Sequence, residues 1–407
     1  MRCGLLGRTL AHSYSPRIHH FLGDYSYELF EVEPENLSTF LLSNDFTGIN
    51  VTIPYKKAVM DYLDECTPVA QQLQAVNTIV RHDGKRIGHN TDYFGFHRML
   101  QQAGLQIAGK KALVLGSGGA SNTAVAVLKE WGADVVVISR TGENNYHNLH
   151  LHSDAALIVN TTPVGMYPQT DQAPLSLDGF PVLEGVLDVI YNPARTPLLQ
   201  EAEQRGLVAL NGLIMLVAQA KEAAQWFTQT AIPDTKIQQI HRILKNEMEN
   251  IVLVGMPGCG KSTLGALLAK RTGKRCVDAD LLIEEMAGCS IAQIFKKEGE
   301  AGFRIWETRA LTQLGKQSGL IIATGGGCVT REENYPLLHQ NGTIFWLQRD
   351  LEKLPTEGRP LSQNGRLQQL FLQRQPLYRR FADHIIDNNG TLEVSADAIL
   401  RILEENV

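Results

Sequence analysis

The sequence predicts an α/β protein with more than one domain, in which helices cover sheets of mainly parallel strands. Its 407 residues are enough for two or three domains of ordinary size. Three short apolar runs lead directly into glycine clusters, at 112–120, 251–262 and 320–327. Apolar runs bounded by glycine are typical of buried parallel strands. Amphipathic helical stretches alternate with these runs, as in α/β architecture.

The overall composition narrows the class of protein. Hydrophobic residues make up 43% of the chain and charged residues 20%, as in ordinary globular proteins. The formal net charge of -5 gives no global attraction to nucleic acid. The six cysteines are scattered without a CxxC pair, so they indicate neither a disulfide framework nor a zinc site. With no bilayer-length apolar stretch and no signal-peptide pattern, we expect a cytoplasmic enzyme with no membrane partner.

The N-terminal hundred residues carry polar side chains that a core would not need. Ser13 and Ser15 precede Pro16, which can start a helix. Hydroxyls at such a start can hold a carboxylate, whereas a helix N-cap alone would need only one of them. Downstream, a strand-like run leads to Lys56, and Asp92 follows a turn. A lysine and a carboxylate that meet in a cleft can pass a proton to a carbonyl group, although each alone is more often a surface charge.

The first glycine loop predicts a dinucleotide site. Gly116 and Gly118 follow a strand-like run and precede a helix, where backbone N–H groups can approach a pyrophosphate. The next predicted strand, 134–138, ends at Arg140 rather than at an acidic residue. An acidic residue there would bind the ribose of NAD, whereas a cation suits a 2′-phosphate. The loop therefore favours NADP over NAD, with a solvated strand end as the less favoured alternative for Arg140.

Residues 1–245 resemble the shikimate dehydrogenase family. The strings that carry the resemblance are GLLG from Gly4, HSYSP from His12, NVTIPYK from Asn50, VNT from Val76, NTD from Asn90, GSGGA from Gly116, NTTPVGM from Asn160, DVIYNP from Asp188 and MLVAQA from Met215. The resemblance implies reversible, NADPH-dependent reduction of 3-dehydroshikimate to shikimate. It also implies a substrate-binding domain at 1–90, to which 212–245 return, and an NADP-binding Rossmann domain at 91–211.

The same resemblance assigns roles to residues. Lys56 and Asp92 would be the catalytic pair. The substrate would be bound through its carboxylate by Ser13 and Ser15, and elsewhere by Thr52, Asn77, Tyr191 and Gln219. NADP would be bound by Gly116, Gly118, Gly119, Ala120, Arg140, Thr141 and Met215.

The second glycine loop predicts a phosphate site. Residues 255–262 read GMPGCGKS, which matches GxxxxGK[ST] between a predicted strand and a predicted helix. Lys261 would reach the β- and γ-phosphates of ATP, and Ser262 would bind Mg²⁺. A helical pattern ends just before this strand, so we expect a new domain to begin near Glu249.

Several charged residues follow this loop. Asp278 and Asp280 would lie on one side of the chain if it is extended there, so that one could serve Mg²⁺ and the other a substrate hydroxyl. Arginine forks such as those of Arg304, Arg359 and Arg374 suit carboxylates and phosphates, although any one alone could be a surface residue. The glycines at 325–327 would let a ligand approach the backbone.

Residues 250–390 resemble the shikimate kinase family. The strings are GMPGCGKS from Gly255, DAD from Asp278, SIAQIF from Ser290, GGG from Gly325, GRPL from Gly358 and RQPLY from Arg374. The resemblance implies transfer of phosphate from ATP, with Mg²⁺, to the 3-hydroxyl of shikimate by a parallel-sheet P-loop domain at 249–407. It implies catalysis by Lys261, Asp280 and Arg359, and binding of the substrate by Arg304, Gly326, Gly327 and Arg374. It also implies binding of ATP by Gly258, Gly260, Lys261, Ser262 and Thr263. Mg²⁺ would be bound by Ser262 and Asp278.

The two resemblances name consecutive reactions, so we expect a bifunctional enzyme of the shikimate pathway of aromatic amino acid biosynthesis. One alternative is an NAD-dependent quinate/shikimate dehydrogenase of broader specificity. Another is a catalytically inactive sensor that regulates transcription, which is disfavoured because all the implied catalytic residues are present. The expected partners are small-molecule substrates, and the sequence leaves open whether the protein forms an oligomer.

Overall fold

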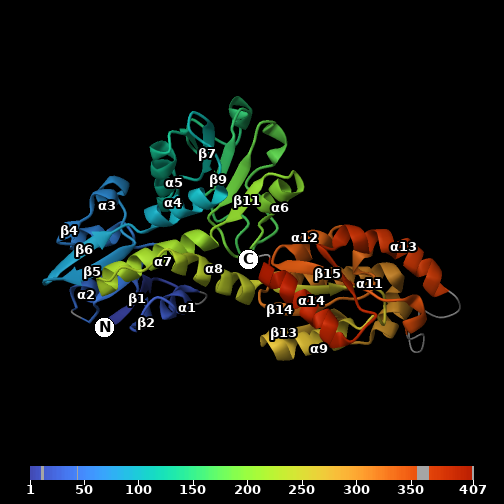
Figure 1. The fold of residues 1–407 in the computed structure, drawn as a ribbon. Coiled ribbons are helices and arrows are strands. Elements are labelled where there is room, and N and C mark those ends of the chain that lie inside the picture. The colour runs from blue at the N-terminus through green and yellow to red at the C-terminus, as the bar shows by residue number, and fades with distance from the viewer. Residues whose placement is uncertain (11–12, 44, 355–365, 406–407) are drawn as a thin grey trace. The chain divides into compact units, whose positions relative to one another are not determined.

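The computed structural model describes residues 1–10, 13–43, 45–354 and 366–405. These form two compact units (Figure 1). The first unit contains residues 1–166, 171–191 and 198–243, and the second contains 167–170, 192–197 and 244–407. The predicted α/β class is confirmed, because helices alternate with strands throughout the described ranges.

The first unit begins with a six-stranded mixed sheet of order β2-β1-β3-β5-β6-β4. β1 runs parallel to β2 and β3, whereas β5 is antiparallel to both β3 and β6. The strands are β1 (Arg2–Gly7), β2 (Ser26–Glu31), β3 (Gly48–Val51), β4 (Glu65–Cys66), β5 (Thr78–His82) and β6 (Lys85–His89). The helices around this sheet are α1 (Ser15–His20), α2 (Leu37–Leu42), α3 (Pro68–Leu73), α7 (Leu213–Thr228) and α8 (Thr235–Met248), the last of which continues into the second unit.

The second sheet of this unit is five-stranded and wholly parallel, in the order β11-β10-β9-β7-β8. Its strands are β7 (Lys111–Leu115), β8 (Asp134–Ile138), β9 (Leu157–Asn160), β10 (Gly185–Asp188) and β11 (Val208–Asn211), and its helices are α4 (Asp92–Ala103), α5 (Gly119–Glu130) and α6 (Pro197–Gln204). The strand order reverses between β7 and β9, and open α/β sheets bind ligands at such a switch point. The first predicted glycine loop follows β7, at this point.

The second unit contains a five-stranded parallel sheet of order β13-β14-β12-β15-β16. The strands are β12 (Asn250–Val254), β13 (Arg275–Asp278), β14 (Leu320–Ala323), β15 (Gly342–Gln348) and β16 (His384–Asp387). The helices are α9 (Lys261–Thr272), α10 (Ala279–Ala287), α11 (Ile291–Gly315), α12 (Asn334–His339), α13 (Arg366–Phe381) and α14 (Leu392–Glu405). β12, β14 and β15 are fully buried apart from Gln348, which explains why their sequences are continuously apolar.

None of the helices in these ranges combines the length and the apolar character that crossing a bilayer requires.

Candidate active sites

The side chains of Lys56 and Asp92 meet in the first unit. Lys56 lies in the turn after β3, and Asp92 begins α4. The Lys56 Nζ donates to the Asp92 Oδ2 at 2.6 Å, and the two side chains are 27% and 15% exposed. The turn is tied to the next segment, because the Val76 N–H donates to the Lys56 carbonyl at 2.7 Å. The carboxylate thus holds a partly shielded ammonium group in one place, where it can give a proton to a bound carbonyl.

A buried polar network adjoins this pair. The Asn77 Oδ1 accepts the Thr91 N–H at 2.7 Å, and the Asn77 Nδ2 donates to the Thr91 hydroxyl at 3.1 Å. That hydroxyl also lies 3.5 Å from the Gln219 Oε1, on α7. The structure therefore brings Asn77 and Gln219 together through Thr91, the residue before Asp92. Thr91 was not predicted, although it stands inside the NTD string.

Helices α4 and α7 meet closely at Gly95, and this contact places two further predicted residues. A Cβ at Gly95 would lie 2.7 Å from the Met215 carbonyl and 3.1 Å from the Gln219 Cβ. Met215 and Gln219 are one helical turn apart on α7, so both lie on the face that packs against α4. Thr52, another predicted residue, is not part of this contact. Its methyl group packs against Gly7 of β1.

The two serines lie next to each other, and neither of them caps α1. The helix has Tyr14 as its N-cap residue, without a side-chain cap. The Ser15 N–H donates to the Ser13 Oγ at 3.2 Å, and the Ser15 hydroxyl bonds the Tyr27 phenol oxygen. The Tyr27 hydroxyl in turn donates to the Asn50 Oδ1 at 2.7 Å. Tyr27 and Asn50 were not predicted, because only the folded sheet brings β2 and β3 beneath the serines.

Tyr191 packs against Tyr14, the residue between the two serines. Its ring meets the edge of the Tyr14 ring, with the centroids 6.1 Å apart. Burial raises the pKa of Tyr191, so the phenol keeps its proton and stays a hydrogen-bond donor.

Two histidines of this unit are buried and neutral. The His19 ring stacks on Tyr27 at 3.9 Å, and burial lowers its pKa to about 3. The His89 ring stacks on Trp226 at 3.7 Å, and burial lowers its pKa to about 4. Neither imidazole therefore carries an extra proton to donate near neutral pH.

These histidines make the first unit sensitive to acid. Below pH 6.5 the unfolded chain takes up a proton on each imidazole, whereas the folded unit does not until about pH 3 or 4. The unfolded state then binds more protons, so the free energy of unfolding falls as the pH is lowered from 6.5 towards 4. We expect His89→Phe to reduce this slope in urea unfolding followed by tryptophan fluorescence. A His147→Gln control, at an exposed site, should leave the slope unchanged; an equal slope in His89→Phe would contradict the expectation.

The predicted dinucleotide loop has an open glycine turn. Gly116 has a φ of +106°, and a Cβ there would lie 3.0 Å from the Thr161 hydroxyl of the loop after β9. Gly118 and Gly119 begin α5, and nothing lies within 4 Å of a Cβ at either position. The residues thus fit a dinucleotide, because backbone N–H groups at a helix start stand open to a pyrophosphate. Ala120 follows in the same turn of α5.

The segment after β8 carries Arg140, predicted for the 2′-phosphate of NADP, and Thr141, also predicted to bind NADP. Arg140 and Thr141 are both exposed. The turn that carries them is braced by the Ser139 Oγ, which accepts the Gly142 N–H at 2.9 Å. A guanidinium on a fixed turn suits a phosphate, as predicted for NADP.

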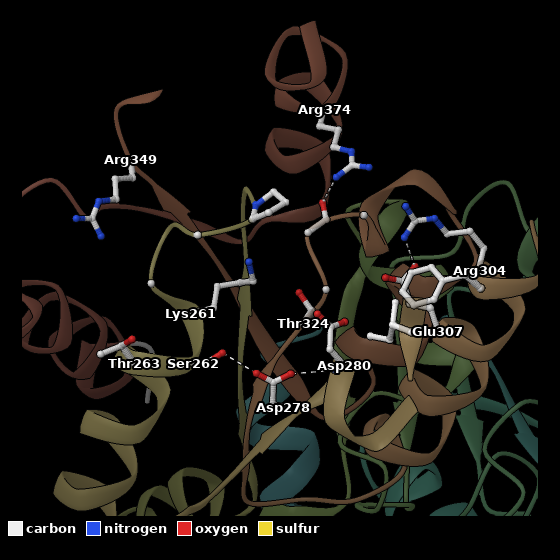
Figure 2. Close-up of a pocket in the computed structure, with 18 of the residues that line it drawn as sticks. Lys261, Ser262, Thr263, Asp278, Asp280, Arg304, Glu307, Thr324, Arg349 and Arg374 are labelled. Carbon is white, nitrogen blue, oxygen red and sulfur yellow. Dashed lines mark hydrogen bonds and ion pairs between the residues drawn. The ribbon is translucent and has the colours of Figure 1, made fainter. Parts of the chain in front are cut away.

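The second unit contains a cavity of about 620 Å³ at the end of its sheet (Figure 2). The P-loop forms one wall, where Gly258 and Gly260 adopt φ values of +84° and +102° that favour glycine. Lys261 is 8% exposed, and its Nζ donates to the carbonyls of Gly255 at 2.9 Å and Met256 at 3.1 Å. The cavity is lined by every residue predicted for ATP and Mg²⁺, namely Gly258, Gly260, Lys261, Ser262, Thr263 and Asp278.

Asp278 and Asp280 both line the cavity, but not as an extended pair. Asp278 ends β13 and caps α10, with its Oδ1 accepting the Asp280 N–H at 3.0 Å. The condition of an extended chain is not met here, because α10 begins between the two residues. The Asp278 Oδ2 accepts the Ser262 hydroxyl at 2.6 Å. These two oxygen atoms fit Mg²⁺, a hard cation that takes oxygen ligands and that P-loop proteins hold through a Ser or Thr hydroxyl and an aspartate.

A second carboxylate lies near Asp280. A Cβ at Gly325 would lie 2.8 Å from both the Asp280 Oδ1 and the Glu307 Oε1, and neither oxygen has a hydrogen-bond partner among the described residues. Burial and the neighbouring Asp278 raise the pKa of Asp280, and burial raises the pKa of Glu307. Glu307 was not predicted, although it stands one helical turn after Arg304.

Two buried arginines face the glycines that follow β14. Arg304 donates to the Glu307 Oε2 at 2.8 Å and to the Glu300 Oε1 at 3.0 Å. Arg374 donates to the Gly326 carbonyl at 3.0 Å, and the hydroxyl of Tyr378, another residue that was not predicted, donates to the same carbonyl. Two guanidinium groups at one cavity wall can bind a carboxylate. Arg359 lies outside the described residues.

Comparison with known proteins finds family matches in both parts of the chain. Residues 257–404 match the family described as shikimate kinase, and residues 5–79 match the shikimate dehydrogenase substrate binding domain. The NADP⁺-type shikimate dehydrogenase of Clostridium beijerinckii is 35% identical over 268 residues, which cover 60% of this chain and 98% of that protein. The chain belongs to the shikimate dehydrogenase family.

Solved structures extend the likeness. A shikimate 5-dehydrogenase from Thermus thermophilus in complex with NADP(H) and shikimate is 33% identical, with a TM-score of 0.55, over 60% of this chain and 99% of that one. A chorismate mutase/shikimate 5-dehydrogenase fusion from Clostridium acetobutylicum is 34% identical, with a TM-score of 0.57, over 60% of this chain and 97% of that one. Shikimate dehydrogenase thus accounts for the first 60% of the chain, and a shikimate kinase domain follows it. These matches confirm the predictions of both enzymes in one chain and of NADP and ATP as their cofactors.

The glycines that follow β14 in the kinase domain can be tested directly by substitution. A Cβ at Gly327 would overlap the guanidinium of Arg304, which Glu300 and Glu307 hold in place. We therefore expect Gly327→Ala to displace Arg304 and raise the KM for shikimate roughly tenfold or more, as loss of a charged hydrogen bond does. Steady-state kinase assays would measure this change.

The control for this substitution is Gly390→Ala, because nothing lies within 4 Å of a Cβ at Gly390. Its KM for shikimate should match that of the unmodified protein. An unchanged KM in Gly327→Ala would show that Arg304 does not hold the substrate.

Proposed function

We propose that this chain reduces 3-dehydroshikimate to shikimate with NADPH in its first unit and phosphorylates shikimate with ATP in its second. One observation carries the proposal: each unit holds the charged groups that its reaction needs, with Lys56 on Asp92 in the first and Lys261, Asp280 and Arg304 around one cavity in the second. The product of the first reaction is the substrate of the second.

Three domains would carry these reactions: a substrate-binding domain at 1–90 and 212–245, an NADP-binding domain at 91–211 and a kinase domain at 249–407. The sheets support this division, since β1–β6, β7–β11 and β12–β16 each fall within one range. Each of the six cysteines is a free thiol, as is usual in the reducing cytoplasm, where we propose that the enzyme works.

In the dehydrogenase, Ser13 and Ser15 bind the substrate carboxylate, while Thr52, Asn77 and Gln219 bind ring oxygens. Tyr191 closes the site as a hydrogen-bond donor. NADPH, held by the loop from Gly116 to Ala120 with Arg140, Thr141 and Met215, supplies the hydride. The Lys56 Nζ gives its proton to the carbonyl oxygen as negative charge develops there. Asp92 keeps the ammonium in position and accepts its hydrogen bond at 2.6 Å.

In the kinase, Arg304 and Arg374 bind the shikimate carboxylate against Gly326 and Gly327. Asp280 accepts the proton of the 3-hydroxyl, for which its unpartnered Oδ1 is available.

The phosphate side of the kinase uses the P-loop. Lys261 leaves the carbonyls of Gly255 and Met256 and binds the β- and γ-phosphates together with the loop N–H groups. Ser262 and Asp278 would hold Mg²⁺, which supplies neutralising charge on the phosphates. Arg359 is proposed to stabilise the transferred phosphoryl group.

A coupled assay tests the whole proposal. The purified full chain receives 3-dehydroshikimate, NADPH and MgATP, and mass spectrometry follows the products. We expect shikimate 3-phosphate, and we expect shikimate alone when ATP is omitted. Absence of the phosphorylated product from a folded protein that is also given shikimate directly would refute the kinase half. Replacement of NADPH by NADH should slow the first step.

A further inference from the structure

The kinase cavity has two differently equipped halves. Figure 2 shows Asp280, Glu307 and Arg304 on one side of Lys261, and Ser262, Thr263 and Arg349 on the other. The first half carries the groups proposed for shikimate. The second half carries the start of α9, where the nucleotide phosphates would lie. Arg349 has been given no role so far.

The fold places Arg349 beside the P-loop. It directly follows β15, which pairs with β12, the strand that leads into the loop. A Cβ at Gly260 would lie 3.7 Å from the Arg349 Nη1. On the same glycine, a Cβ would lie 3.1 Å from the Asn388 Nδ2, which donates to the Cys259 carbonyl at 2.6 Å. Asn388 therefore fixes the loop, and the guanidinium of Arg349 stands next to it.

The guanidinium lacks the protein partners that its counterparts have. The Arg349 Nε is buried and has no hydrogen-bond partner among the described residues. Arg304, by contrast, is held by two carboxylates, and Arg374 donates to the Gly326 carbonyl. A buried donor without a partner costs free energy unless a ligand satisfies it.

The other cations of the cavity are already accounted for. Lys261 belongs to the β- and γ-phosphates, and Arg304 and Arg374 lie with the shikimate groups. Lys353 is 47% exposed and pairs with Asp350 at 3.4 Å. Among the cations that line the cavity in the described part of the chain, Arg349 therefore remains without an assigned ligand, and it lies on the side where the nucleotide would bind.

We propose that Arg349 is a nucleotide-binding residue whose guanidinium binds the α-phosphate of ATP and of ADP. This inference rests on the proposed kinase function and adds a residue to it. A guanidinium fork matches two phosphate oxygens, and its position next to Gly260 and on the Thr263 side of Lys261 places it towards the nucleoside end of the phosphate chain.

The test uses the full chain with Arg349→Met, which removes the charge and keeps the length of the side chain. Binding of ADP with Mg²⁺ is measured by calorimetry, and KM values come from kinase assays. We expect the Kd for ADP and the KM for ATP to rise about tenfold or more, as the loss of a charge-assisted contact predicts. The KM for shikimate and the dehydrogenase activity should stay within twofold. Arg349→Lys keeps the positive charge but lacks the two-pronged guanidinium. Its Kd for ADP should therefore lie between those of the unmodified protein and of Arg349→Met.

Two controls separate the possible outcomes. Arg380→Met removes an exposed arginine that pairs with Glu332 outside the cavity, and it should leave ADP binding unchanged. Binding of adenosine should be unaffected by Arg349→Met, because adenosine has no phosphate; an equal loss for adenosine would mean that the arginine stacks on the base and would overturn the proposal. A Kd for ADP within twofold of the unmodified protein would also overturn it.

The outcome is distinct from failure of the proposed function. If the unmodified protein phosphorylates shikimate and Arg349→Met binds ADP normally, only the inference about Arg349 is wrong. If the unmodified protein shows no ATP-dependent phosphorylation, the kinase function itself is wrong. If Arg349→Met does not fold, its thermal unfolding transition will be lost or shifted to a lower temperature. In that case the Kd for ADP of the milder variant, Arg349→Lys, decides the question.

Discussion

Lys56→Ala is expected to abolish NADP-linked oxidation of shikimate and to leave its ATP-dependent phosphorylation near normal. The substitution removes the proposed proton donor and leaves Asp92, 15% exposed, without its cation. Loss of a positioned general acid lowers the rate by roughly 10²–10⁴-fold. Absorbance of NADPH measures the first activity, and release of ADP measures the second.

The neighbouring Lys57 supplies a matched control. It is exposed, so Lys57→Ala changes the charge by the same amount without touching the pair. Its dehydrogenase activity should remain within twofold of the unmodified protein. The assignment of Lys56 would be refuted if Lys56→Ala kept more than about a tenth of the unmodified rate. Loss of a general acid should leave a much smaller fraction of that rate. Parallel loss of both activities would refute the assignment of two separate sites.

Lys261→Ala is expected to have the opposite effect, with the kinase lost and the dehydrogenase retained. The Lys261 side chain is 8% exposed, and its donors are positioned on the P-loop carbonyls, from which they can turn to phosphate oxygens. Removing one positioned donor to developing charge costs on the order of 10²–10³-fold in kcat. Release of ADP in the presence of shikimate measures the effect.

Lys270, in the last turn of the same helix, gives the control for this experiment. It is exposed, and Lys270→Ala should leave the kinase rate unchanged. Equal losses in the two variants would mean that α9, and not the phosphate contact, is the sensitive feature.

The parts of the fold that depend on local signals were predictable. The strands before Gly116, Gly255 and Gly325 lie where the apolar runs placed them, as β7, β12 and β14. The mixed character of the first sheet was not anticipated. Its antiparallel pair, β5 and β6, is joined at Asp83 and Gly84, whose φ values are +49° and +77°. Asp-Gly is a hairpin sequence, so this signal was available.

The site residues divide in the same way. Lys56 and Asp92 stand in strings that could be read along the chain, but their 2.6 Å contact depends on how the fold brings the turn after β3 to the start of α4. Glu307 and Tyr378 were missed, because a glutamate or a tyrosine on a helix is ordinary until its neighbours in space are known. Asn50 was missed for a similar reason, since its partner Tyr27 comes from a different strand.

The side chain of Asp278 is held in place by the folded kinase domain itself, before any ligand binds. One carboxylate oxygen begins α10 and the other holds the Ser262 hydroxyl, so the rotamer is already fixed. The entropy of ordering these two groups is therefore lost during folding and not during association. A site preorganised in this way binds with less structural adjustment. Any variant that loosens the start of α10 should therefore weaken the affinity for the proposed Mg²⁺ even when the Asp278 carboxylate and the Ser262 hydroxyl remain.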